Sequence, residues 1–132
     1  MVLEDNFFIE TLLPSAILRP LTEEEHEEYR RPFSKAGTDR LATLAGPRQL
    51  PIAGEPAEAV NIIESYSKYL VNSNDVPKLF INAEPGAFLV GYARDFVRTF
   101  PNQKEVTVKG AHFIQEDSPS EIGQALADWL PK

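Results

Sequence analysis

Only two segments of the chain have the pattern of β-strands, and this small number is the strongest constraint on the fold. Lys78–Ala83 contains a solid apolar run, which is typical of a strand buried on both faces. Glu105–Lys109 alternates polar and apolar residues, as a half-buried strand does. Helical patterns precede, separate and follow the strands. This order predicts an α/β fold with parallel strands joined by right-handed helical crossovers.

Three helices are expected around these strands. The first runs for about four turns from Pro56, which suits a first helical position. The second covers Ala87–Phe100, which carries an apolar stripe. The third begins at Ser118, whose segment to Glu121 combines an N-cap, a proline and a capping box. Two parallel strands are too few for a doubly covered sheet, so we expect partner strands outside this polypeptide.

The first half of the chain is irregular. Apolar residues recur at near-helical spacing over Phe7–Leu13, which predicts a short helix that either packs as a lid or lines an apolar pocket. Thr22 and Glu25 have the spacing of a capping box, so a second helix is expected to start there. Glycines and prolines recur without a period from Ser34 to Gly54, which predicts a loop with one short helical turn.

Composition excludes several classes of function. The 132 residues suffice for one domain, and the absence of cysteine excludes disulfides, thiolate metal sites and cysteine nucleophiles. A net charge of −7 without a Lys/Arg cluster argues against a nucleic-acid or anionic-membrane surface. No apolar run approaches the ~20 residues that cross a bilayer. We therefore expect a soluble protein, cytoplasmic rather than exported, although its opening at Met1 reads as a cut inside a domain and leaves the compartment open.

The two histidines occupy different settings. His26 lies among glutamates, which predicts a solvated surface residue. His112 follows the second predicted strand directly after Gly110-Ala111, and ligands of open α/β sheets bind beyond the carboxyl ends of strands. A histidine there is either a general base or a loop residue that bonds a backbone carbonyl.

Other candidates for chemistry are few. Glu84 follows the first strand, where it could orient His112 as the acid of a catalytic triad or serve as a turn residue. No Gly-x-Ser-x-Gly elbow occurs, so the residues alone name no nucleophile. Two distant histidines without cysteine give no ligand set, so no metal site is expected. We also expect no cofactor.

Several motifs together resemble the haloalkane dehalogenases, which have the α/β-hydrolase fold. They are Gly110-Ala111-His112-Phe113-Ile114-Gln115-Glu116-Asp117-Ser118-Pro119, Pro77–Gly86, Leu50–Gly54, Leu18–Leu21 and residues 1–14. The opening also resembles the coelenterazine-type luciferases, close relatives that share the histidine segment. The resemblance implies the C-terminal part of an α/β-hydrolase fold, incomplete alone. Residues 1–53 would form part of a helical cap, and residues 54–132 would form the last βαβα part of the main domain.

The resemblance also implies a reaction. In this family an aspartate displaces halide from an alkyl carbon, and a histidine then activates the water that cleaves the resulting ester. His112 would be that general base. The residues implied to line the substrate pocket are Phe8, Leu12, Pro47, Leu50, Ala87, Phe88 and Phe113. Glu84 would not be the triad acid, because the subgroup with Asn-Ala-Glu-Pro-Gly takes its acid from an earlier strand.

Two departures from the family accompany this resemblance. Gly46 stands where close relatives have a tryptophan, which should open the tunnel mouth or loosen that loop. The nucleophile, the halide-binding tryptophan and asparagine, and the triad acid would all lie upstream of Met1. We therefore expect the chain to be inactive alone and to need an N-terminal complement, a separate chain or a missing segment, to act on small apolar halogenated substrates.

Two further hypotheses stay open. The first is a luciferase-like, cofactor-independent monooxygenase, or an ancestor that carries both activities. The second is a non-catalytic complementation module in which His112 is only structural.

Overall fold

The computed structural model describes residues 1–131, which form two compact units. The helical unit comprises residues 1–15 and 20–65. The strand-containing unit comprises residues 16–19 and the chain from Tyr66 onward. These units are not the same as the predicted cap (residues 1–53) and main domain (residues 54–132), and that division stays a prediction. None of the helices described over residues 1–131 is both long and apolar enough to cross a bilayer.

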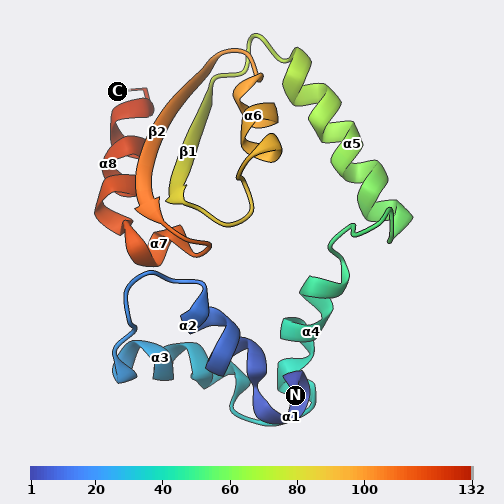
Figure 1. Cartoon of the computed structure of the whole chain (residues 1–132), viewed down its shortest axis with the longest axis vertical. Helices are drawn as coiled ribbons and strands as arrows, with labels where there is room; N and C mark the ends of the chain where they lie inside the picture. The colour runs from blue at the N-terminus through green and yellow to red at the C-terminus, as the bar shows by residue number, and fades with distance from the viewer. Residues whose placement is uncertain (132) are drawn as a thin grey trace. The chain divides into compact units, whose positions relative to one another are not determined.

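The helical unit consists of short helices (Figure 1). They are α1 (Val2–Asp5), the π-helix η1 (Phe8–Leu12), α2 (Leu13–Ser15), α3 (Glu23–Arg30), the 3-10 helices η2 (Arg31–Phe33) and η3 (Thr38–Arg40), α4 (Leu41–Arg48) and the first part of α5 (Ala57–Asn72). Ile9 and Leu13 are its buried apolar side chains. The predicted capping box of α3 is confirmed, because Thr22 Oγ accepts the Glu25 N–H at 3.2 Å and the Glu25 carboxylate accepts the Thr22 N–H at 2.8 Å.

A buried arginine organises the irregular backbone of the helical unit. Arg40 donates from Nε to the Phe33 carbonyl at 2.9 Å and from Nη1 to the Leu3 carbonyl at 3.0 Å. It also donates to the carbonyls of Glu4 and Ser34. These carbonyls lie at the ends of short helices, where four C=O groups lack an intrahelical partner, and a guanidinium offers only donors. Arg40 therefore replaces hydrogen bonds that the short helices cannot make.

The prediction of one short turn between Ser34 and Gly54 was wrong, because α4 is an eight-residue helix. Its first five residues are Leu, Ala and Thr, of which Leu and Ala are strong helix formers. Gly46 precedes Pro47 near the end of the helix, where the lack of a β-carbon relieves the crowding before a proline. Gly46 and Pro47, which were expected to mark a loop, therefore lie at the end of a helix.

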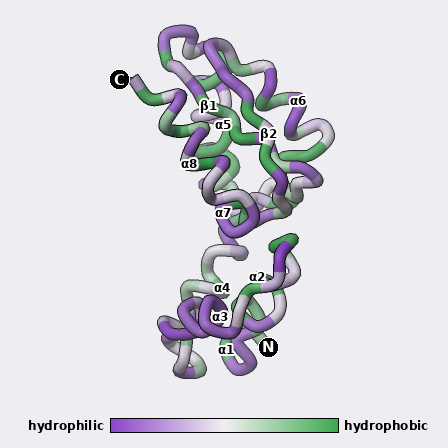
Figure 2. Tube along the Cα trace, turned by 90° about the vertical axis from the view of Figure 1, so that its left-hand side faces the viewer, coloured by the Kyte–Doolittle hydropathy of each residue, from purple (hydrophilic) through white to green (hydrophobic). Residues whose placement is uncertain are grey.

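The strand-containing unit is built on β1 (Lys78–Pro85) and β2 (Gln103–Gly110), which pair in parallel. The α/β prediction and the parallel pair are confirmed, and both strands are longer than predicted. Phe80 is buried, whereas Leu79 and Ile81 are half-buried, so burial on both faces of β1 is incomplete within residues 1–131. Figure 2 colours stretches of the strand pair as hydrophobic and most of α3 as hydrophilic.

Helices lie on both sides of this strand pair (Figure 1). They are α6 (Tyr92–Arg98) and α8 (Pro119–Trp129), and the single turn α7 (Ile114–Asp117) lies between β2 and α8 in sequence. The second part of α5 belongs to the same unit. Arg98 of α6 pairs with Glu105 of β2, whereas Ala125 of α8 borders a groove with Val106 and Val108. Successive strand residues point to opposite faces, so α6 and α8 cover opposite faces of β2.

One helix start was predicted wrongly, and the other was confirmed without its predicted side-chain contacts. The helix expected over Ala87–Phe100 begins only at Tyr92, because Gly91 has φ 52° and ψ −131°, which no helix accommodates. Ser118 does precede α8, but it makes no cap hydrogen bond and no capping box. Its hydroxyl instead donates to the Lys109 carbonyl at 2.7 Å and fixes the start of α8 to the end of β2.

Candidate functional site

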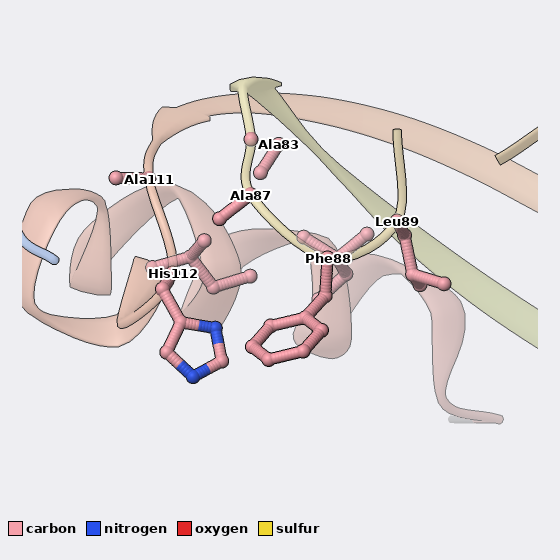
Figure 3. Close-up of a pocket in the computed structure, with 9 residues that line it drawn as sticks. Ala83, Ala87, Phe88, Leu89, Ala111 and His112 are labelled. Carbon is pink, nitrogen blue, oxygen red and sulfur yellow. The ribbon is translucent and has the colours of Figure 1, made fainter. Parts of the chain in front are cut away.

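A small cavity of about 180 Å³ lies beyond the carboxyl ends of β1 and β2 (Figure 3). It is lined by Ile81, Ala83, Gly86, Ala87, Phe88, Leu89, Ala111, His112 and Ile114. His112 is the only polar side chain in this lining. The cavity is smaller than the ~300–1,000 Å³ typical of drug-sized ligands, so its size and apolar walls suit a small apolar molecule.

The His112 ring stands between two phenylalanines. Its centroid lies 4.5 Å from that of Phe88 and 4.6 Å from that of Phe113, with both pairs tilted. Figure 3 shows the rings of His112 and Phe88 side by side. The side chain is exposed, and neither ring nitrogen has a hydrogen-bond partner among residues 1–131. Both nitrogens can therefore bind a water, a substrate or an acid.

The loop that carries His112 is held by backbone contacts. The His112 and Phe113 N–H groups both donate to the Ala16 carbonyl, at 3.0 and 3.2 Å. Gly110 begins the loop where Ile114 packs directly above it, and a β-carbon there would lie 2.9 Å from the Ile114 methyl. The alternative of a purely structural loop histidine would have the ring bond a carbonyl, but only the backbone of His112 does so.

The opposite wall of the cavity is the loop after β1. Gly86 turns the chain with φ 76°, and a β-carbon there would lie 2.8 Å from the Ala83 carbonyl oxygen. Arg94 donates from Nη2 to that carbonyl at 2.9 Å and from Nε to the Leu89 carbonyl at 3.0 Å. Ala87 and Phe88 therefore lie on a tied loop and not on the helix predicted for them.

The other residues implied to line a pocket are distributed over both units. Phe113 packs against His112 but is not part of the cavity lining. Phe8 and Leu12 lie on η1, Pro47 lies in α4 and Leu50 follows α4, all in the helical unit. Leu12 and Leu50 are 38% and 44% exposed. The role of these four residues over the cavity stays a prediction.

Glu84 is exposed at the end of β1, opposite Lys109 in the strand register. Its carboxylate makes no hydrogen bond with His112 within the described residues. In the same part of the chain no cluster of three or more His, Cys, Asp or Glu side chains could hold a metal ion.

The prediction of a solvated His26 was wrong. Its side chain is only 13% exposed, with Nε2 2.8 Å from the Ile9 carbonyl and Nδ1 3.1 Å from Arg30 Nη2. A carbonyl only accepts and a guanidinium only donates, so both contacts are satisfied when Nε2 donates to Ile9 and Nδ1 accepts from Arg30. His26 joins α3 to η1, a contact between residues 17 positions apart that the local glutamate pattern does not indicate.

Sequence reasoning missed the residues that hold the two loops, above all Arg94 and Asp117. Asp117 accepts the Ala111 N–H at 3.0 Å beside the histidine. The signal available was the position of Asp117 in the same motif as His112, but its partners depend on the tertiary fold.

Comparison with known proteins finds that the chain is similar to haloalkane dehalogenases. No protein-family model matches it. A haloalkane dehalogenase from Sphingobium indicum is 60% identical over 130 residues, which cover 98% of this chain and 44% of that protein. A coelenterazine h 2-monooxygenase from Renilla reniformis is 43% identical over 133 residues, which cover 100% of this chain and 42% of that protein.

A solved structure of a putative ancestral haloalkane dehalogenase superposes with a TM-score of 0.89 at 42% identity, covering 98% of this chain and 45% of that one. The chain thus spans less than half the length of each of these relatives. The resemblance to haloalkane dehalogenases is confirmed, and the chain has the fold of the C-terminal part of these α/β-hydrolases.

Proposed function

We propose that this chain contributes a general base, His112, and part of a cap to a haloalkane dehalogenase. The observation that carries the proposal is the cavity after β1 and β2, whose lining is apolar except for one imidazole. An apolar wall suits the alkyl part of a haloalkane, and an imidazole with both nitrogens unpaired within residues 1–131 can take a proton from water.

The proposed reaction has two steps. A carboxylate oxygen forms a bond to the alkyl carbon as the carbon–halogen bond breaks and halide leaves. His112 then takes a proton from water, whose oxygen attacks the ester carbonyl. The bond between the acyl carbon and the alkoxy oxygen breaks, the leaving oxygen takes the proton back from His112 to become the alcohol, and the regenerated carboxylic acid releases its proton to solvent. The products are alcohol, halide and a proton, and no redox partner is required.

We assign the nucleophilic carboxylate and the triad acid to an N-terminal complement of the same fold. The unpaired edge of β1 supports this assignment, because β1 pairs with β2 alone among residues 1–131 and a parallel pair is a minimal sheet. The relatives also extend well beyond the length matched by this chain. The chain alone is therefore proposed to be inactive.

The test combines this chain with the N-terminal remainder of the Sphingobium indicum dehalogenase, either co-expressed or fused. We expect halide release from a bromoalkane by the combination and none by either part. His112→Phe should lower turnover by ~10²–10⁴-fold, as loss of a general base does. Halide release by the purified chain alone, or unchanged turnover after His112→Phe, would contradict the proposal.

A second candidate is a coelenterazine monooxygenase activity, favoured by the 43% identity to the Renilla reniformis protein. Light emission from coelenterazine by the completed protein, without halide release from bromoalkanes, would support it. A third candidate is a non-catalytic assembly module. It predicts that the completed protein binds its complement but performs neither reaction, whichever residue stands at position 112.

A further inference from the structure

The Asp117 carboxylate accepts backbone N–H groups from two segments, one of them 99 positions from Asp117 and the other 6. Oδ1 accepts from Leu18 at 2.8 Å and from Arg19 at 3.3 Å. Oδ2 accepts from Ala111 at 3.0 Å, the residue before His112. Hydrogen bonds to an ionised carboxylate are about twice as strong as neutral ones, so this contact is a strong tie between residues 16–19 and the histidine loop.

Residues 16–19 and the histidine loop are also joined by hydrogen bonds whose acceptor lies in residues 16–19. The Ala16 carbonyl accepts the N–H groups of His112 and Phe113. Arg19 adds a hydrogen bond from Nε to the Glu116 carbonyl at 2.7 Å and an ion pair with the Glu116 carboxylate at 2.9 Å. The backbone of His112 is therefore held from the residue before it, from its own N–H and from the residue after it.

Asp117 itself is well fixed. It ends the single turn α7, and the next residue, Ser118, is buried and donates its hydroxyl to the Lys109 carbonyl of β2 at 2.7 Å. Because Ser118 fixes the neighbouring residue Asp117 to β2, the carboxylate holds Ala111 and residues 16–19 in place relative to β2. Without it, the amides of Ala111, Leu18 and Arg19 would have no charged acceptor to bring them together.

We propose that Asp117 is a positioning residue for His112: it fixes the loop so that the imidazole stays against Phe88 at the cavity wall. This inference rests on the proposed function, in which His112 acts as the base. Asparagine is a poor replacement, because both carboxylate oxygens accept N–H groups and one of them would become an NH₂ donor facing a donor. Glutamate keeps two acceptors and displaces them by one methylene.

The test uses the completed enzyme and a bromoalkane, and it separates halide release in the first turnover from ester hydrolysis. Asp117→Asn should retain the halide burst, which requires only the nucleophile, and should slow ester hydrolysis by about 10- to 100-fold, the size of effect that a displaced catalytic group produces. Normalising to the burst amplitude removes any unfolded fraction. Asp117→Glu should recover part of the rate.

The matched control is Asp128→Asn in α8. Its carboxylate accepts a hydrogen bond from the Gln124 side chain and no backbone amide within residues 1–131, so ester hydrolysis should stay within about twofold of the unmodified enzyme. A second measurement uses this chain itself. Amide hydrogen exchange of Ala111 and Leu18 should accelerate about tenfold or more in Asp117→Asn and stay unchanged in Asp128→Asn.

The outcomes separate the two proposals. Stalled ester hydrolysis in His112→Phe with normal hydrolysis in Asp117→Asn overturns the positioning role and leaves the proposed function intact. Normal hydrolysis in His112→Phe overturns the proposed function, and with it the positioning role in catalysis. Unchanged exchange of Ala111 and Leu18 in Asp117→Asn overturns the structural tie on which the inference depends.

Discussion

The helical unit and the strand-containing unit each use one charged side chain to hold irregular backbone, but the charges are opposite. Arg40 gathers carbonyls, whereas Asp117 gathers amides. The difference follows from local geometry, since the carbonyls of Leu3 and Phe33 lie near ends of short helices and the amide of Ala111 lies just beyond a strand. In the helical unit the contacts of Arg40 stabilise the backbone. In the strand-containing unit the contacts of Asp117 also hold the loop of His112, the only polar side chain of the cavity lining.

The largest effect is expected for Arg40→Met. The substitution removes several charge-assisted hydrogen bonds, although the Leu3 carbonyl keeps the Gly37 N–H as a donor, so unfolding free energy should fall by about 2–4 kcal/mol. Urea unfolding followed by circular dichroism measures the loss. Arg48→Met is the control, because Arg48 is exposed in the last turn of α4. Equal losses in the two variants would show that Arg40 does not organise its unit.

A second test concerns the cavity loop of the strand-containing unit. Gly86→Ala places a β-carbon 2.8 Å from the Ala83 carbonyl at a positive φ, so we expect a loss of about 1–3 kcal/mol. Gly123→Ala in α8 meets open space and should stabilise by about 0.5–1 kcal/mol. Thermal unfolding of both variants checks the contrast. A neutral Gly86→Ala would mean that the loop is not fixed as described.

A smaller, stabilising effect is expected in the helical unit. Gly46 lies within α4, and a β-carbon added there would meet nothing within 4 Å. Gly46→Ala should therefore gain about 0.5 kcal/mol of unfolding free energy, because the helix propensity of alanine is partly offset by crowding against Pro47. Gly54→Ala is the counterpart: its φ of 86° predicts a loss in equally open space. Melting temperatures that move in the same direction would contradict this distinction.

The smallest effect concerns pH. Arg98 donates to both carboxylate oxygens of Glu105, at 2.9 and 2.7 Å, and holds the pKa of Glu105 below its usual 4.5. The stabilisation is therefore fully present above that pH and is lost as pH falls through the lowered pKa. Glu105→Gln should lower the melting temperature slightly at about pH 7 and leave it unchanged at about pH 2. An equal shift at both pH values would exclude the ion pair as its cause.

The two units also differ in how much the sequence predicts. Thr22 and Glu25 identify the start of α3 because their contacts are local, and the strand periods place β1 and β2 for the same reason. The topological rule for parallel sheets places His112 at the ligand-binding edge from the order of elements alone. The late start of α6 was missed because the apolar stripe continues on both sides of Gly91. The stripe carries no information about the backbone conformation of Gly91, which keeps the helix from starting earlier.

Contacts across long sequence separations were not predictable. Asp117 meets Leu18 at a separation of 99 residues, and Arg40 meets Leu3 at 37. Charged side chains in such patterns are normally solvated, so the sequence favours exposure for them. Their roles emerge only when the fold brings unpaired backbone groups to them, which is also why His26 was placed at the surface.

The central claim is that His112 acts as the base that cleaves an alkyl ester. It is tested most directly by intact mass spectrometry of the completed enzyme carrying His112→Phe after exposure to a bromoalkane. The alkyl group should stay covalently attached to the complement, with one halide released per enzyme. Continued turnover without an accumulated adduct would contradict it.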